Sequence, residues 1–137
     1  MPDFDYDFSV FIGRFQPFHL GHHYVVSKAL EATEHVIVLI GSAHQPRSLR
    51  NPFSFREREQ QLRTCFSFEQ NQRIFVAPLM DVLYNEELWI KNVQETIYGF
   101  VRAHHKHIQR TPSIALIGHR KDHSSYYLNL FPQWDSI

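Results

Sequence analysis

Two histidines with a glycine between them, His19 and His22 around Gly21, form the most chemically informative pattern in this sequence. They follow a short hydrophobic run and open a segment with helical character, and side chains three positions apart share one face of a helix. The first turn of a helix also presents unpaired N–H groups and a favourable dipole to anions. Because Gly21 has no side chain, a bulky ligand can approach its backbone closely. The pattern predicts a turn that handles phosphate groups.

A metal site is the main alternative for histidines in this chain. Zinc in proteins needs a third and usually a fourth ligand at suitable spacing, and neither a cysteine nor an acidic cluster lies near His19 and His22. A second histidine-rich group, residues 104–107, invites the same hypothesis. Adjacent histidines at a helix end point in different directions, and cations suit a helix C-terminus. We therefore expect a solvated helix end there, and no metal held by the protein's own side chains.

Composition limits the classes of partner. The chain has 137 residues, enough for one domain with a real core, and its 14 basic and 14 acidic residues leave no net charge to attract nucleic acid or acidic membranes. A single cysteine, Cys65, excludes an intramolecular disulfide and suits a reducing compartment. The acidic N-terminus is unlike a signal peptide, and the longest aliphatic run, residues 36–40, is too short to cross a bilayer. We expect a soluble cytoplasmic protein that binds neither nucleic acid nor membrane, while a homo-oligomer stays open.

Strand-like and helix-like segments alternate along the chain. Hydrophobic stretches predict strands at residues 10–12, 35–40, 73–77 and 113–118. Helices are predicted at residues 20–33, 54–65 and 86–102, with a further short helix at 124–131. Ser54 and Glu57 mark the start of the second helix by a capping-box pattern. This alternation predicts an α/β fold, with right-handed crossovers and a parallel sheet covered by helices on both faces.

Polar side chains collect in the loops that follow the predicted strands. In parallel sheets of this kind, ligands bind beyond the carboxyl ends of the strands, so these four loops should converge. In chain order, they hold His19 and His22; Ser42 with Arg47 and Arg50; Asp81 with Asn85; and Gly118 with His119, Arg120 and Lys121. Imidazoles, cations and small polar groups are the side chains that a nucleotide needs. The sequence therefore predicts a nucleotide site at this edge of the sheet.

At this point the sequence resembles a known family. Residues 13–22, Gly-Arg-Phe-Gln-Pro-Phe-His-Leu-Gly-His, are similar to the HxGH signature of nucleotidyltransferases, in the form carried by nicotinamide-mononucleotide adenylyltransferases. The likeness continues at residues 41–43, at 50–53 with Glu57 and Arg58, and from Asp81 to Trp89. Residues 116–135 resemble the bacterial branch in which the enzyme is fused to a Nudix hydrolase. The resemblance implies a Rossmann-like nucleotidyltransferase fold.

One family motif falls outside these residues. The family carries a late Ser/Thr–Arg motif that holds the ATP phosphates, and the sequence ends at Ile137, before that motif is expected. We therefore expect residues 1–137 to form a single nucleotidyltransferase domain without that motif and without a Nudix domain.

The resemblance also implies an activity and a set of site residues. The reaction is adenylyl transfer from ATP to nicotinamide mononucleotide by direct in-line attack, giving NAD and pyrophosphate, with Mg²⁺ carried by the substrate phosphates. By resemblance, the catalytic residues are Arg14, His19 and His22. The implied ATP-binding residues are Gly13, Phe15, Gly21, Gly118, Arg120 and Lys121. The implied acceptor-binding residues are Ser42, Arg50, Asp81, Asn85 and Trp89, with Arg47 as a substitute for Arg50.

Several alternatives stay open at this stage. Trp89 fits a stack on the nicotinamide ring, but it also begins an apolar stripe with Val93, Ile97 and Val101 that is typical of a buried helix face. The same HxGH turn serves phosphopantetheine adenylyltransferases and cytidylyltransferases, which use other phosphorylated acceptors. The segment from Asp81 to Trp89 favours nicotinamide mononucleotide over these. A non-catalytic nucleotide-binding regulatory domain is a further alternative.

Overall fold

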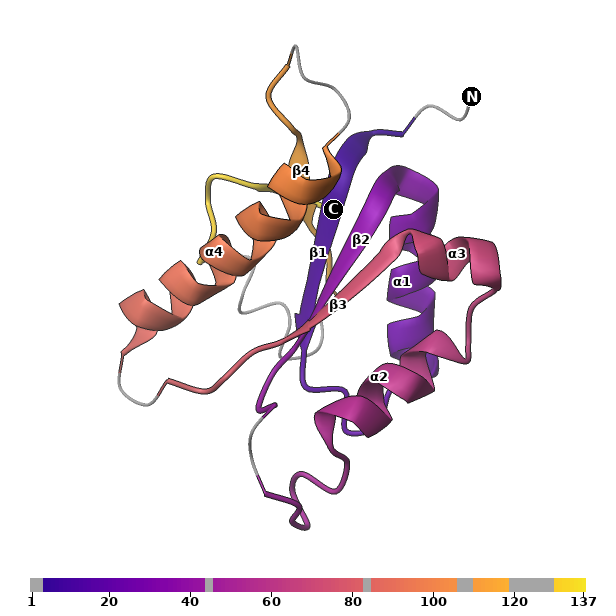
Figure 1. Ribbon diagram of the computed structural model, residues 1–137, viewed down its shortest axis with the longest axis vertical. Helices are drawn as coiled ribbons and strands as arrows, with labels where there is room; N and C mark the ends of the chain where they lie inside the picture. The colour runs from indigo at the N-terminus through magenta and orange to yellow at the C-terminus, as the bar shows by residue number, and fades with distance from the viewer. Residues whose placement is uncertain (1–3, 44–45, 83–84, 106–109, 119–129) are drawn as a thin grey trace.

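A five-stranded, all-parallel sheet forms the centre of the molecule, with the strand order β3-β2-β1-β4-β5 (Figure 1). The computed structural model describes residues 4–43, 46–82, 85–105, 110–118 and 130–137. Its strands are β1 (Tyr6–Gly13), β2 (Thr33–Ile40), β3 (Ile74–Pro78), β4 (Ile114–Leu116) and β5 (Asp135–Ser136). The prediction of a parallel sheet is confirmed.

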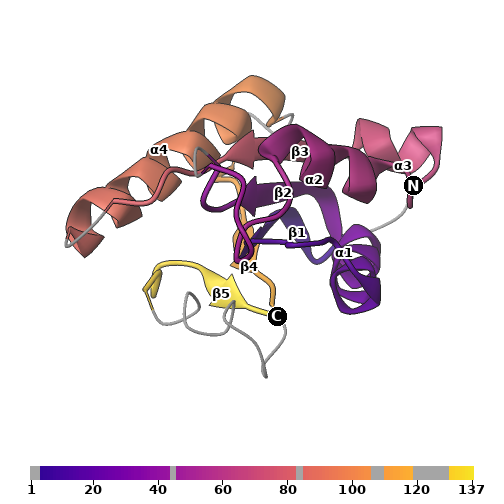
Figure 2. The ribbon, with the colours of Figure 1, turned by 90° about the horizontal axis from the view of Figure 1, so that it is seen from below.

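Helices cover both faces of this sheet, as predicted. They are α1 (Leu20–Ala32), α2 (Phe55–Arg63), α3 (Phe68–Gln72) and α4 (Glu86–His104). In Figure 2, α4 lies on one side of the sheet and α1 on the other. None of the described helices is long and apolar enough to span a bilayer.

Two hydrophobic cores result from the alternation of side chains along the central strands. Phe8, Val10 and Ile12 of β1 face α4 and pack with its Val93 and Ile97. The opposite face of the sheet packs against α1 and α2 in a second cluster, to which Phe11, Val26, Ala29, Val38 and Leu62 belong. Because both faces are buried, β2 reads as a continuous apolar run rather than as an alternating one.

The structure extends or adds to some of the predicted elements. Strand β1 begins at Tyr6, four residues before the predicted start at residue 10. Helix α3 and strand β5 have only 5 and 2 residues, and neither was predicted. The predicted helix at 124–131 falls almost entirely on residues 119–129, outside the described part of the chain.

An ion pair between the buried Asp7 and the exposed Arg110 fixes the start of β1 against the start of β4. Arg110 donates two hydrogen bonds of 2.7 Å to the two carboxylate oxygens of Asp7, and the Ser113 N–H donates a third of 2.9 Å. Burial would raise the pKa of Asp7, but the hydrogen bonds from Arg110 and Ser113 and the Arg110 charge outweigh it, so the pKa lies below its ordinary value. The carboxylate therefore stabilises the fold in its ionised form.

The stability of the fold should depend on this group in acid. Because the folded-state pKa of Asp7 lies below its ordinary value of 3.8, the stabilisation is present above that value and is lost as the pH falls through the lowered pKa. We expect the free energy of unfolding in urea to fall between about pH 5 and pH 2. Asp7→Asn should be about 1–3 kcal/mol less stable at neutral pH, with a shallower fall in acid. Asp5→Asn, at an exposed position nearby, is the control; a wild-type pH profile in Asp7→Asn would contradict the assignment.

Candidate active site at the carboxyl edge of the sheet

The first turn of α1 is closed by two imidazoles. His19 is the N-cap, and its Nδ1 accepts a 3.0 Å hydrogen bond from the Gly21 N–H. The Nδ1 of His22 accepts a 3.2 Å bond from the His19 N–H, which completes a capping box made of histidines. The two rings stack with their centroids 3.7 Å apart. Since Nδ1 accepts in both rings, the proton of each neutral ring resides on Nε2, which is a hydrogen-bond donor.

An aromatic cup orients the His22 ring. The centroids of Phe15, Phe18 and Phe11 lie 4.7, 5.6 and 6.1 Å from the centroid of His22. All three phenylalanines are buried, and Phe15 is only 2% exposed. The side chain of Phe15 is therefore part of the support beneath His22, and its main chain is the part that a nucleotide could reach.

Two glycines have a steric reason for being glycine. A Cβ on Gly21 would lie 2.9 Å from Cε1 of His19, and a Cβ on Gly13 would lie 2.8 Å from Cζ of Phe15. Both distances are shorter than side chains in proteins tolerate. Gly21 thus lets His19 fold over the helix start, and Gly13 lets Phe15, at a positive φ of 52°, pack back against the end of β1.

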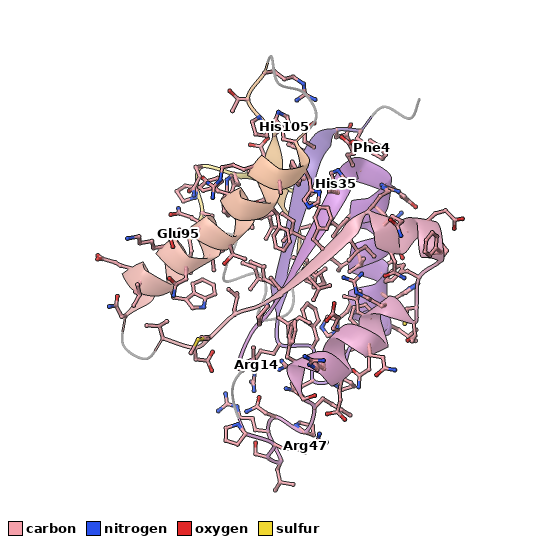
Figure 3. All side chains as sticks on the ribbon, viewed as in Figure 1. Phe4, Arg14, His35, Arg47, Glu95 and His105 are labelled. Carbon is pink, nitrogen blue, oxygen red and sulfur yellow. The ribbon has the colours of Figure 1, made fainter. Side chains whose placement is uncertain are left out.

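Arg14 follows β1 with an unsatisfied donor. Its Nη2 donates a hydrogen bond to Oδ1 of Asn51, in the loop that precedes α2. Its Nε is buried and has no hydrogen-bond partner among the described residues. A buried guanidinium N–H without a partner is costly, and an anionic oxygen would satisfy it. Figure 3 shows Arg14 beyond the carboxyl ends of the strands, at the end of the molecule opposite to His105 and Phe4.

The loops after β2 and β3 meet on the other side of the site. Ser42, which is 7% exposed and has a positive φ of 52°, donates a 2.9 Å hydrogen bond from Oγ to Oδ2 of Asp81. The Ala43 N–H donates to the Leu79 carbonyl over 3.0 Å. A serine in the left-handed region is strained, and such positions are common at functional sites. The structure therefore brings together two residues that the sequence placed in one site.

The start of α4 carries the remaining predicted acceptor residues. Asn85 is the N-cap of α4, and its Oδ1 accepts a 3.0 Å hydrogen bond from the Leu88 N–H. Trp89 lies one turn later, half-buried against the core, with its ring centroid 6.1 Å from that of Phe131. Asn85 thus has a structural role of its own, and the half-buried position of Trp89 is compatible with both a core contact and a stacking contact.

The basic residues of the loop after β2 differ in their contacts. Arg47 forms an exposed 2.9 Å ion pair with Glu57, whereas Arg50 is exposed beside it. The Ser54 N–H, helped by the Arg47 charge, holds the pKa of Glu57 below its ordinary value. Arg47 thus contacts the start of α2 through an exposed ion pair, which contributes little on its own.

Other predicted residues lie at the margin of the described structure. Gly118 follows β4, half-buried, at the same edge of the sheet as Gly13. Arg120 and Lys121 lie outside the described residues. In the second histidine group, the His104 ring stacks on Phe75 with centroids 4.1 Å apart, while Lys106 and His107 lie outside the described residues. No group of three or more metal-ligating side chains is present in the described part of the chain.

Two residues to which the sequence analysis assigned no role hold the site together. Gln16 donates from Nε2 to the Phe53 carbonyl over 3.0 Å and accepts from the Phe53 N–H over 2.9 Å, so it joins the turn after β1 to the start of α2. Arg58 of α2 is 1% exposed and donates to main-chain carbonyls of the same region. Side-chain bonds to main-chain atoms leave no pattern in a sequence, although the Glu57-Arg58 match was a weak pointer.

A cavity of about 400 Å³ lies at the opposite end of the sheet, lined in part by Tyr98 and Trp134. Its carboxylate, Asp135, already accepts a 2.8 Å hydrogen bond from the Tyr6 hydroxyl. Ligands of parallel α/β sheets bind at the carboxyl edge. The carboxyl edge, with its strained serine and unsatisfied guanidinium, is therefore the candidate active site.

Comparisons with known proteins agree with this geometry. Residues 10–124 match the cytidylyltransferase-like family. A nicotinamide/nicotinic acid mononucleotide adenylyltransferase of Acinetobacter baylyi is 39% identical over 98% of this chain and 67% of its own length. A nicotinamide-nucleotide adenylyltransferase of Archaeoglobus fulgidus is 39% identical over 66% of this chain and 54% of its own length.

A solved structure shows the same fold. It is a bifunctional NMN adenylyltransferase/ADP ribose pyrophosphatase from Francisella tularensis, complexed with AMP and a manganese ion. It matches 96% of this chain with a TM-score of 0.81 and 36% identity, and this chain covers 36% of its length. The chain therefore belongs to the cytidylyltransferase-like family, as a relative of its nicotinamide-nucleotide adenylyltransferases.

Proposed function

We propose that this protein transfers the adenylyl group of ATP to nicotinamide mononucleotide, giving NAD and pyrophosphate. The observation that carries the proposal is the pair of stacked imidazoles that cap α1, together with Arg14 after β1, whose buried Nε has no partner among the described residues. This arrangement suits a polyphosphate. The adenylyltransferase relatives supply the reaction class.

The chemistry needs positioning rather than a general base. The acceptor phosphate is already an anion, and one of its oxygens attacks the α-phosphorus of ATP. The bond from the α-phosphorus to the bridging oxygen breaks, and its electron pair leaves with pyrophosphate. Negative charge builds on the transferring and leaving phosphates, so donors fixed in advance stabilise the transition state. We assign this role to Nε2–H of His19 and His22 and to the guanidinium of Arg14.

The two substrates would lie on opposite sides of these donors. We place ATP along the turn after β1 and the end of β4, near Gly13, Gly21 and Gly118, with Arg120 and Lys121 as further phosphate ligands. We place the acceptor against the Ser42–Asp81 pair, with Arg50 on its phosphate and Asn85 and Trp89 at the nicotinamide end. Mg²⁺ would be held by phosphate oxygens and water, because it keeps several waters and favours substrate phosphates. We place this reaction in the cytoplasm.

A panel of acceptors tests the proposal. The protein is incubated with ATP, Mg²⁺ and, separately, nicotinamide mononucleotide, nicotinate mononucleotide and phosphopantetheine, and both pyrophosphate and the adenylylated product are measured. We expect dinucleotide formation with the nicotinamide or nicotinate acceptor. Adenylylation of phosphopantetheine alone would reassign the acceptor, and nucleotide binding without pyrophosphate release would indicate a regulatory domain.

Trp89 gives a test of the acceptor side. Trp89→Ala should raise the KM for nicotinamide mononucleotide about fivefold and leave the KM for ATP nearly unchanged, because an aromatic stack contributes about 1 kcal/mol. The matched control is Ile90→Ala, the next residue of α4, which is partly buried against the same core. Equal losses of stability in both variants, without a selective effect on the mononucleotide, would assign Trp89 to the core alone.

A further inference from the structure

Arg58 is a buried cation held by main-chain carbonyls. It lies on α2 and is 1% exposed. Its Nη1 donates to the carbonyls of Arg14 and Gly41 over 2.8 and 2.7 Å, and its Nη2 reaches the carbonyl of Ser42 at 3.4 Å. Its Nε donates over 3.1 Å to the Ser54 carbonyl at the start of its own helix. One guanidinium therefore joins the ends of β1 and β2 to α2.

These carbonyls belong to the two sides of the candidate site. Arg14 lies on the side assigned to ATP, and Ser42, which is bonded to Asp81, lies on the side assigned to the acceptor. The Gly41 N–H adds a 2.7 Å hydrogen bond to the Gly13 carbonyl between the same two loops. Arg58 is thus in direct contact with the backbone of a residue on each side.

The charge of Arg58 has no acidic counterpart in the described part of the chain. Its hydrogen bonds all go to carbonyls, and its pKa is lowered by burial and then by the neighbouring charge of Arg14. A buried charge is costly, and an apolar side chain of similar size is often as stable. What an apolar side chain cannot do is donate to three carbonyls from two loops, because only the guanidinium has that set of donors.

We propose that Arg58 is a positioning residue for adenylyl transfer, which fixes the loop that carries Arg14 relative to the loop that carries Ser42. The inference rests on the proposed function, since the two loops hold different substrates only if two substrates react. In-line attack depends on the relative placement of the two phosphates, and a displacement of about 1 Å can cost a hundredfold in rate. Loss of Arg58 should therefore lower kcat more than it raises either KM.

Arg73 is a matched control for the structural part of this role. It is partly buried, whereas Arg58 is fully buried, and it too donates to main-chain carbonyls, those of Glu34, Thr33 and Leu30. These contacts lie at the amino edge of the sheet, away from the candidate site. Arg73→Gly thus removes the same kind of bonds from the same sheet without touching either substrate loop.

The experiment compares Arg58→Gly with Arg73→Gly in stability, kcat and both KM values. We expect similar losses of stability, a kcat about a hundredfold lower for Arg58→Gly only, and partial recovery of that kcat by guanidinium chloride at millimolar, non-denaturing concentration. Sodium chloride at equal ionic strength should not restore it. Arg58→Lys, which keeps the charge but not the planar fork, should have an intermediate kcat and covers the case in which the glycine variant does not fold. Equal kcat in Arg58→Gly and Arg73→Gly would overturn the inference.

Hydrogen exchange separates this inference from the proposed function. In the nucleotide-free protein, the Gly41 amide should exchange faster in Arg58→Gly or Arg58→Lys than in wild type and should be unchanged in Arg73→Gly. Unchanged exchange in the Arg58 variants would overturn the positioning role even if wild type is active. A wild type that forms no dinucleotide would overturn the proposed function, while faster exchange would still show that Arg58 holds the two loops together.

Discussion

His22→Ala should lower kcat by about two to three orders of magnitude, because in the proposed mechanism it removes a donor to the charge that develops in the transition state. The aromatic cup of Phe11, Phe15 and Phe18 fixes the ring in advance, so no other side chain replaces it at that place. His19→Ala should lower kcat to a similar extent and should also cost about 1 kcal/mol of stability, because His19 is the N-cap of α1. The measurements are steady-state kinetics and thermal unfolding.

His23→Ala is the control for both histidine variants. His23 follows His22 directly in α1, but its ring stacks on Phe66 with centroids 4.9 Å apart, on a different face of the helix. We expect its kcat to stay close to that of wild type. If His19→Ala and His22→Ala kept normal turnover, or lost no more than His23→Ala, the imidazole pair would have only a structural role.

Arg14→Lys should lower kcat by about a hundredfold or more, although it preserves the positive charge. An arginine that neutralises a transferring phosphoryl group contributes about 10³–10⁵ in rate in related chemistry. A lysine provides a single ammonium in place of the planar fork, so it cannot both bond Asn51 and present the second donor, Nε, to a phosphate. The loss should therefore appear in kcat at saturating ATP, with folding intact.

Two variants check the Arg14 assignment. Arg47→Lys changes an exposed guanidinium at the same end of the molecule that is paired with Glu57 (Figure 3), and it should leave kcat nearly unchanged. Asn51→Ala removes the partner of Arg14 but keeps its guanidinium, and it should cost much less than Arg14→Lys. Equal losses in Asn51→Ala and Arg14→Lys would mean that Arg14 acts by anchoring the loop and not through a phosphate.

The sheet was predictable because hydrophobic periodicity reports burial on both faces. The central parallel strands and three helices follow from it, and the capping pattern at Ser54 and Glu57 marked the start of α2 correctly. The first half of β1 was missed because Asp7 and Ser9 are polar. Both are buried in the structure. Asp7 is paired with Arg110, and the hydroxyl of Ser9 forms a 2.9 Å hydrogen bond with that of Thr33. Because both partners are distant in sequence, the local pattern did not show them.

The sequence predicted the part of the candidate site that is formed by loops at the carboxyl ends of the strands. The rule that carboxyl ends converge placed Ser42 and Asp81 together, and the hydrogen bond between them confirms that placement. The roles of Gln16 and Arg58 could not be predicted in the same way. Their side chains donate to main-chain carbonyls, which every residue has, so the sequence does not mark the partners. The role of each predicted substrate-binding residue stays a prediction until the variants above are measured.

The central position of β1 has a consequence for how the chain folds. Strand β1 pairs on one side with β2, which follows within a few tens of residues, and on the other with β4, where Phe8 lies opposite Ile114. Pairing β1 with β4 closes the long loop from Phe8 to Ile114, and this closure costs entropy before any contact is gained. Topologies with such distant partners reach the native state slowly. The segment from β1 to β3, with its helices, is contiguous and contains the imidazole pair, Arg14 and Ser42. A nascent chain therefore presents the segment with the imidazole pair before β4 and β5 are made, and these two strands extend the sheet on the other side of β1 later.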